Sequence, residues 1–231
     1  MQLPKGSTVA DIGAGTGNYS GALIDQGYRV ISVEPEKQMR DNSLRTDLSW
    51  VASAAEQIEL PDHSVDGITA INCVHHFSNL RQALREFDRI LKDGPMILFT
   101  FDPSVSVRMW LFDYWPSLRA VEEAAYLPVD QLCGQIEEVF GKQPDVLPFL
   151  LPRDFSDVFS AALWSRPQLL FDSNTIKASS LLSSLDPSAL QEGLEQLRID
   201  LDTGRFAQKY PALAQCQAYD AGCRLLVVRK G

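Results

Sequence analysis

The sequence is poor in the residues that build disulfide frameworks, metal centres and nucleic-acid interfaces. It has four cysteines, none in a C-x-x-C pair, and three histidines, which indicates buried, reduced thiols and predicts no metal site. Acidic residues number 30 against 21 basic ones, a net charge of −9, and no lysine and arginine cluster supplies a basic face for nucleic acid. No apolar run is long enough to span a membrane, and no secretory leader is recognised. We therefore expect a cytoplasmic protein that acts on a small molecule, or at most on a protein, without nucleic-acid or membrane partners.

What the sequence does contain is a glycine-rich stretch near its start, V-A-D-I-G-A-G-T-G-N-Y-S over residues 9–20. A short apolar run ends in an acid, three glycines alternate with small residues, and a helical pattern continues to about Gln26. Glycines allow a backbone to turn tightly and to approach a ligand closely. The pattern is typical of the strand, turn and helix that open a nucleotide-binding α/β sheet.

The residues around the glycines indicate which nucleotide this turn binds. A dinucleotide fingerprint has its third glycine where Asn18 stands. The carboxylate of Asp11, just before the turn, repels a pyrophosphate and attracts a ligand with positive groups. S-adenosylmethionine carries an ammonium and a sulfonium and has no phosphate. The stretch therefore favours S-adenosylmethionine as the cofactor.

A second acid follows at the distance expected for a ribose contact. The β-branched run 29–33 predicts a buried second strand, and Glu34 ends it about twenty residues after the glycine turn. A carboxylate at that place suits the two hydroxyls of an adenosine ribose; the alternative is a solvated acid at a strand end. Pro35 can begin the next helix, which is expected to carry Met39 inward.

Further motifs carry a resemblance to a known family. Residues 53–66 read S-A-A-E-Q-I-E-L-P-D-H-S-V-D, residues 75–77 read H-H-F, and residues 89–95 read R-I-L-K-D-G-P. Together with the glycine stretch, they resemble the type 11, ubiquinone-biosynthesis-like branch of the class I S-adenosylmethionine-dependent methyltransferases. The resemblance is dense over residues 8–103.

The resemblance and the order of the strands together predict a cofactor site. The resemblance implies that backbone groups beside Ala55, with the acid Glu56, hold the adenine. Asn72 and Cys73 follow the predicted fourth strand, 65–71, and such sheets present ligands at the carboxyl ends of their strands. The predicted cofactor-binding residues are Asp11, Gly13, Ala14, Gly15, Glu34, Pro35, Met39, Ala55, Glu56, Asn72 and Cys73.

Two adjacent histidines follow the same strand and are the predicted catalytic residues. We expect one ring of His75 and His76 to face the cleft and the other to pack against the sheet. Methyl transfer is an in-line displacement, in which the protein mainly aligns the acceptor and excludes water. A general base is needed only if the acceptor must lose a proton, and His76 or His75 is then the first candidate, followed by Asp102. The alternative is that both histidines are structural.

The chain beyond residue 103 predicts an inserted helical cap. Two mostly helical stretches, 104–141 and 152–218, are too long to be ordinary crossovers and follow strands whose carboxyl ends face the ligand. We expect them to cover the substrate cleft. The candidate substrate residues are Trp110, Tyr114, Trp115, Arg153 and Trp164. Alternatively, the aromatic residues form the core of the cap itself.

The whole pattern predicts an α/β fold with a Rossmann-like, seven-stranded, mostly parallel sheet. The family resemblance implies that the last strand, 223–229, is antiparallel and lies between the fifth strand, 96–101, and the sixth, 145–150. Pro148 lies inside the predicted sixth strand, 145–150, and because proline cannot donate a ladder hydrogen bond, this strand is expected at a sheet edge. The predicted S-adenosylmethionine-binding core comprises residues 1–103, 142–151 and 219–231. Family members carry helices before the first strand, so either such helices lie outside this sequence or the cap takes their place.

Two alternatives to a methyltransferase stay open at this point. A protein can keep the S-adenosylmethionine pocket and transfer nothing, because binding and turnover use the same motifs. A nicotinamide-dependent oxidoreductase also begins with a glycine turn, although Asp11 and Asn18 speak against it.

Overall fold

The chain forms two compact units in the computed structural model, which describes residues 3–156 and 159–230. The first unit comprises Met1–Thr100, Val129–Leu147 and Arg224–Gly231, and the second comprises Phe101–Pro128 and Pro148–Cys223. Within the described ranges, no helix combines the length and the apolar character that crossing a membrane requires.

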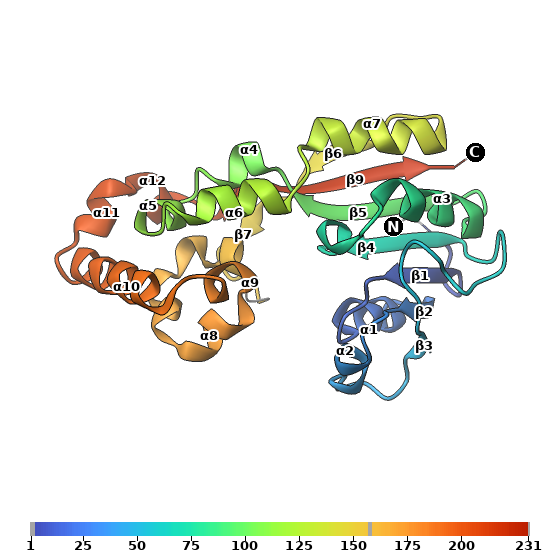
Figure 1. Ribbon diagram of the computed structural model, residues 1–231, viewed down its shortest axis with the longest axis horizontal. Helices are drawn as coiled ribbons and strands as arrows, with labels where there is room; N and C mark the ends of the chain where they lie inside the picture. The colour runs from blue at the N-terminus through green and yellow to red at the C-terminus, as the bar shows by residue number, and fades with distance from the viewer. Residues whose placement is uncertain (1–2, 157–158, 231) are drawn as a thin grey trace. The chain divides into compact units, whose positions relative to one another are not determined.

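A seven-stranded sheet forms the centre of the first unit (Figure 1). Its strands are β1 (Thr8–Ile12), β2 (Arg29–Val33), β3 (Ser49–Val51), β4 (Gly67–Ile71), β5 (Pro95–Phe101), β6 (Asp145–Pro148) and β9 (Cys223–Arg229). The order across the sheet is β3-β2-β1-β4-β5-β9-β6. The pairs from β3 through β5 are parallel, and β9 runs opposite to β5. This confirms the predicted fold class, the place of the last strand and the edge position of the sixth.

The central strand β1 is buried on both faces. Val9, Ala10 and Ile12 have almost no exposed surface, as expected for a parallel strand covered by helices. Ala10 is in register with Ile31 of β2 on one side and Ile68 of β4 on the other. The chain leaves β1 toward β2 and later enters β4 on the opposite side, so the strand order reverses here. Ligands of α/β sheets bind at such a switch point, beyond the carboxyl ends of the strands.

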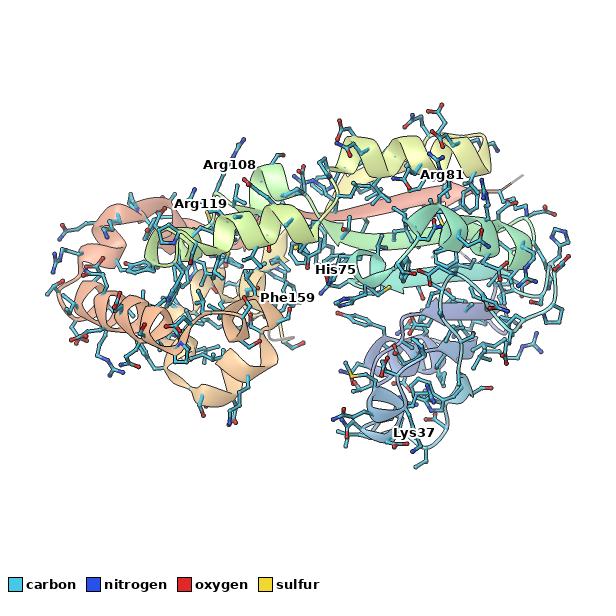
Figure 2. The ribbon with its side chains drawn as sticks, in the orientation of Figure 1. Lys37, His75, Arg81, Arg108, Arg119 and Phe159 are labelled. Atoms are coloured by element: carbon cyan, nitrogen blue, oxygen red, sulfur yellow. The ribbon has the colours of Figure 1, made fainter. Side chains whose placement is uncertain are left out.

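The helical elements of the first unit are α1 (Asn18–Asp25), α2 (Lys37–Asp41), η1 (Val74–His76), α3 (Leu80–Ile90) and α7 (Val129–Phe140). Asn79 caps the N-terminus of α3, because its side chain accepts a hydrogen bond from the amide of Gln82 at 3.1 Å. Helix α7 packs beside α3, and Arg81 on α3 forms an ion pair with Glu138 on α7, with an Nη2–Oε2 distance of 2.6 Å (Figure 2). The sequence pattern predicts residues 129–140 as part of the helical cap, whereas they belong to the sheet-containing unit.

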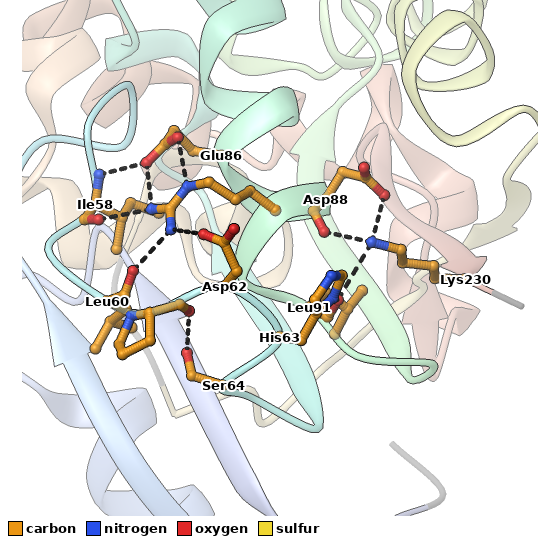
Figure 3. Close-up of polar contacts among 11 residues, drawn as sticks. Ile58, Leu60, Asp62, His63, Ser64, Glu86, Asp88, Leu91 and Lys230 are labelled. Atoms are coloured by element: carbon orange, nitrogen blue, oxygen red, sulfur yellow. Dashed lines mark hydrogen bonds and ion pairs between the residues drawn. The ribbon is translucent and has the colours of Figure 1, made fainter.

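Arg89 holds the loop before β4 against α3. Its guanidinium donates to the carbonyl oxygens of Ile58 and Leu60, each at 2.8 Å, and to the carboxylates of Asp62 and Glu86 (Figure 3). This hydrogen bonding lowers the pKa of Glu86. The loop that the family resemblance assigns to adenine binding is therefore fastened to a helix.

The second unit is largely helical, as predicted for most of its length. Its elements are α4 (Pro103–Ser106), α5 (Leu111–Tyr114), α6 (Leu118–Ala125), η2 (Ser160–Ser165), η3 (Pro167–Phe171), α8 (Ser173–Ala178), α9 (Ser180–Ser183), α10 (Pro187–Asp202), α11 (Arg205–Lys209), α12 (Pro211–Gln215) and the strands β7 (Leu151–Pro152) and β8 (Ala218–Tyr219). The two strands form an antiparallel ribbon. Strands of two residues are too short to show an alternating pattern, so the sequence does not predict this ribbon.

Tryptophans and one buried acid form the core of the second unit. Trp110, Trp115 and Trp164 are at most 2% exposed, and the indole of Trp110 donates to the carbonyl oxygen of Trp164 at 3.0 Å. Asp200, fully buried on α10, accepts from the hydroxyl of Tyr114 at 2.8 Å and from Nζ of Lys209 at 2.7 Å. These contacts join α5, α10 and α11.

Two helical glycines test the packing of the two units separately. A Cβ atom at Gly193 of α10 would lie 2.1 Å from Nε1 of Trp115, whereas a Cβ at Gly134 of α7 would meet nothing within 4 Å. We expect Gly193→Ala to destabilise the protein by about 1–3 kcal/mol through overpacking. Gly134→Ala should stabilise it by about 0.5–1 kcal/mol through helix propensity.

Urea unfolding followed by circular dichroism measures both changes. Equal effects of the two substitutions, in either direction, would contradict this account of the packing.

Candidate functional site

The glycine turn between β1 and α1 is held in a conformation that favours glycine. Gly13, Gly15 and Gly17 have φ values of +65°, +57° and +83°, in the left-handed region. A Cβ at Gly13 would lie 2.6 Å from Cβ of Cys73, and one at Gly17 would lie 2.2 Å from Cδ1 of Leu48. At Gly15 a Cβ would meet nothing within 4 Å. The turn is therefore closely packed at its two ends and open at Gly15.

Glu34 lies beside this opening. Its carboxylate, on a residue that is only 7% exposed, accepts from the amide of Gly15 at 2.9 Å and from the amide of Glu36 at 3.0 Å. One acid thus connects the glycine turn after β1 with the end of β2. An acid at this place is where α/β nucleotide sites bind ribose hydroxyls, so Glu34 and the space at Gly15 fit the adenosine part of S-adenosylmethionine.

Asp11 is buried and hydrogen-bonded inside the sheet. It is 1% exposed, and its two oxygens accept from the hydroxyls of Ser20 at 2.6 Å and Thr69 at 2.9 Å. The hydroxyl of Ser32 donates in turn to Ser20 at 2.8 Å. Burial raises the pKa of Asp11, and the two hydroxyls oppose that effect. Asp11 therefore joins α1, β1 and β4, and its attraction for a cationic ligand stays a prediction.

The carboxyl end of β4 brings Asn72 and Cys73 to the same turn. Asn72 has a left-handed φ of +51°, which is uncommon for residues other than glycine, and its amide donates to the carbonyl oxygen of Phe99 at 2.9 Å. The thiol of Cys73 donates to the carbonyl oxygen of Ile12 at 3.1 Å. Burial, and then the charges of Asp11 and Glu34, raise the pKa of Cys73. The thiol is therefore protonated at neutral pH and is a poor nucleophile.

The paired histidines form the short helix η1 directly after these residues. The ring centroids of His75 and His76 are 3.9 Å apart. Burial, and then the neighbouring His76, lower the pKa of His75 to about 4. The imidazole of His75 is therefore neutral at physiological pH and is a weak base.

The remaining predicted cofactor residues occupy two places in the first unit. Ala55 is buried, whereas Glu56 accepts from the hydroxyl of Ser78 and the amide of Asn79, both at 3.0 Å, at the start of α3. Pro35 and Met39 are exposed at α2, although the sequence analysis expects Met39 to point inward. The adenine contacts of Ala55 and Glu56 stay predictions.

All five predicted substrate residues belong to the second unit, and their contacts are internal to it. The three tryptophans lie in its core, and Tyr114 donates to Asp200. Arg153 donates from Nε to the carbonyl oxygen of Cys216 at 3.0 Å, and its guanidinium lies 5.2 Å from the ring centroid of Trp164. These contacts match the alternative that the sequence left open, an internal core of the helical insertion.

Some buried polar residues have no motif that would reveal them. Glu122 and Asp200 are buried acids within amphipathic helices, and at such helical positions a sequence pattern gives no sign of burial. Among the residues that the structure describes, no cluster of three or more histidine, cysteine, aspartate or glutamate side chains could hold a metal ion.

The strand order, the glycine turn and the acid at the end of β2 define a nucleotide-binding α/β core. The family described as "Methyltransferase domain" matches residues 10–99. A crystal structure from Anabaena variabilis, described as a methyltransferase from an antibiotic biosynthesis pathway, is 39% identical with a TM-score of 0.93, covering 99% of this chain and 92% of that chain. The chain belongs to the S-adenosylmethionine-dependent methyltransferases, and S-adenosylmethionine is its cofactor.

Curated relatives match part of this chain. A protein of Geobacillus sp. (strain WCH70), named as an uncharacterised methyltransferase, is 31% identical over 147 residues, or 62% of this chain and 66% of that protein. A ubiquinone/menaquinone biosynthesis C-methyltransferase of Vibrio campbellii is 31% identical over 105 residues, or 40% of each chain. The chain thus spans about two fifths to two thirds of the length of these relatives. The predicted family branch is confirmed.

Glu34 and Glu36 form a matched pair for testing the ribose contact, because both are acids after β2 but only Glu34 is buried beside the turn. We expect Glu34→Gln to weaken S-adenosylhomocysteine binding by roughly 10–100-fold, because a charge-assisted acceptor is lost. Glu36→Gln should bind as tightly as the unaltered protein. Isothermal titration calorimetry measures both affinities, and equal affinities would exclude Glu34 from the site.

Proposed function

We propose that this protein transfers the methyl group of S-adenosylmethionine directly to a small-molecule acceptor by in-line displacement. The observation that carries the proposal is the state of the groups at the carboxyl ends of β1 and β4. The thiol of Cys73 is kept protonated by burial, and both oxygens of Asp11 already accept hydrogen bonds. Neither group is suited to carry a covalent intermediate, which supports a single displacement from the methyl donor to the acceptor.

The residues of the first unit would divide the binding task among them. Glu34 would accept the ribose hydroxyls, and the open side of Gly15 would allow the nucleoside to approach the backbone. Ala55 and Glu56 would lie at the adenine, while Gly13, Asn72 and Cys73 would lie toward the methionine part. When bound, S-adenosylmethionine supplies a methyl group that is already activated by the sulfonium. The protein's contribution is then alignment and exclusion of water.

The two histidines of η1 would handle a proton if the acceptor must lose one. His76 is the first candidate. His75, with a pKa of about 4, is better suited to accept a hydrogen bond from the acceptor than to hold its proton. Asp102, the third candidate, accepts from the amide of Ser104 at 3.1 Å at the start of α4.

A small molecule is the acceptor class that the charge and the relatives favour. The net charge of −9 disfavours nucleic acid. The Anabaena protein is described as belonging to an antibiotic biosynthesis pathway and the Vibrio enzyme to quinone biosynthesis; both names concern small molecules. We accordingly propose that the protein acts in the cytoplasm, on neither nucleic acid nor membranes.

An activity screen tests the acceptor class. The purified protein is incubated with S-adenosylmethionine and with pools of small metabolites, tRNA or cell protein, and S-adenosylhomocysteine is measured. We expect product formation that depends on a small-molecule pool. Turnover with only the tRNA or protein pool would contradict the proposal.

The third histidine provides a control for the catalytic pair, since His63 lies in the loop before β4, where its Nδ1 is 3.2 Å from the carbonyl oxygen of Leu91. With an acceptor from the screen, we expect the double substitution His75→Ala and His76→Ala to lower kcat by about 100-fold. S-adenosylhomocysteine affinity should not change. His63→Ala should retain full turnover, and unchanged turnover in the double variant would remove both histidines from the mechanism.

A further inference from the structure

A row of polar side chains crosses the centre of the parallel sheet. Asp11 of β1 is in register with Ser32 of β2 on one side and with Thr69 of β4 on the other. Residues in register on parallel strands present their side chains to the same face of a sheet. All three are at most 6% exposed, and buried polar groups cost free energy unless hydrogen bonds satisfy them. The row therefore needs hydrogen-bond partners within the protein.

Ser20, on α1, connects two members of this row. The residue is fully buried. Its hydroxyl donates to Oδ2 of Asp11 at 2.6 Å and accepts from the hydroxyl of Ser32 at 2.8 Å. The hydroxyl of Thr69 donates to the other carboxylate oxygen, Oδ1, at 2.9 Å. The contacts Ser32–Ser20–Asp11, which we call the serine bridge, thus link β2, α1 and β1, whereas Thr69 contacts the same carboxylate from outside the bridge.

The serine bridge also takes the place of a cap at the start of α1. Gly17 precedes the helix and, as a glycine, has no side chain that could cap it. Burial raises the pKa of Asp11, whereas hydrogen bonds from the Ser20 hydroxyl, from Thr69 and from the Ser20 amide lower it. The Asp11 carboxylate therefore accepts from the amide of the third helical residue, as the side chain of an N-cap residue does. The start of α1 is in this way fixed by an acid of β1.

The contact between Ser20 and Asp11 closes the glycine turn, which lies between these two residues in the chain. The three glycines of the turn adopt left-handed conformations, and glycine loses more conformational freedom than any other residue when it is ordered. Ser32 continues the bridge to β2, two residues before Glu34. The carboxylate of Glu34 accepts from the amide of Gly15 at 2.9 Å. The serine bridge therefore fixes both the turn and the strand that this hydrogen bond joins.

We propose that Ser20 and Ser32 are positioning residues for S-adenosylmethionine. The serine bridge holds the glycine turn in the conformation in which the Gly15 amide and the Glu34 carboxylate are placed to meet the nucleoside. Because both serines are fully buried, they act through the turn and do not touch the ligand. The inference rests on the proposed function, since it uses the proposed place of the nucleoside beside Gly15 and Glu34.

Two substitutions of the same shape test the hydroxyl of Ser32. Ser32→Thr keeps the hydroxyl, Ser32→Val replaces it with a methyl group, and both branched side chains suit a strand. We expect Ser32→Val to bind S-adenosylhomocysteine roughly five- to tenfold more weakly than Ser32→Thr, because a turn that is less often in its competent conformation binds with lower apparent affinity. Isothermal titration calorimetry on the full chain measures both affinities, and equal values would overturn the proposal.

Ser20→Ala removes the centre of the serine bridge, and Thr69→Val is the matched control because it alters the same carboxylate from outside the bridge. We expect Ser20→Ala to weaken S-adenosylhomocysteine binding about tenfold and Thr69→Val to bind within about twofold of the unaltered protein. Thermal unfolding confirms that both variants are folded. With an acceptor from the screen, Ser20→Ala should raise the KM for S-adenosylmethionine and leave kcat unchanged. Unchanged affinity in Ser20→Ala, or equal weakening by Thr69→Val, would show a role in stability alone and contradict the proposal.

Glu34→Gln separates a failure of this proposal from a failure of the proposed function. Weakened S-adenosylhomocysteine binding in Glu34→Gln, together with full affinity in Ser20→Ala and Ser32→Val, would overturn the role of the serine bridge and keep the cofactor site. Full affinity in Glu34→Gln, or no binding by the unaltered protein, would count against the proposed place of the nucleoside and would overturn the role of the serine bridge with it.

Discussion

The hydrogen bond from the amide of Gly15 to the carboxylate of Glu34 is the contact on which the proposed cofactor site depends. It joins the turn after β1 to the end of β2. The turn that carries this amide has left-handed backbone conformations at Gly13, Gly15 and Gly17, and Cys73 and Leu48 occupy the space where side chains at Gly13 and Gly17 would lie. The turn, the acid and the switch point of the sheet therefore belong to one arrangement. This arrangement fits the methyltransferase family to which the chain belongs.

Three buried acids illustrate how differently the two units compensate charge. Asp11 is compensated by the hydroxyls of Ser20 and Thr69, and it ties the sheet together. Asp200 is paired with Lys209, which lowers its pKa, and it joins helices. Glu122 is buried on α6, and the hydroxyl of Ser106 is the one group that opposes the effect of burial on its pKa.

The sheet could be predicted from the sequence because its strands are apolar runs that end in recognisable turns. The place of β9 and the edge position of β6 followed from the family resemblance and from Pro148, and both are confirmed. The placement of α7 could not be predicted, because the apolar pattern of an amphipathic helix shows which face is buried but not which element packs against that face. The role of the tryptophans in the insertion could not be predicted for a related reason. In the sequence, an aromatic residue that lines a pocket cannot be distinguished from one that packs in a core. The burial of Glu122 could not be predicted from the sequence, because it depends on tertiary packing around α6.

A crystal structure of the protein grown with S-adenosylhomocysteine, and of crystals soaked separately with NAD, tests the central claim most directly. The account predicts that S-adenosylhomocysteine occupies the space beside Gly15, with a ribose hydroxyl within hydrogen-bond distance of the Glu34 carboxylate, and that NAD does not bind there. Density for a pyrophosphate beside Gly15, or a nucleoside bound away from Glu34, would contradict it.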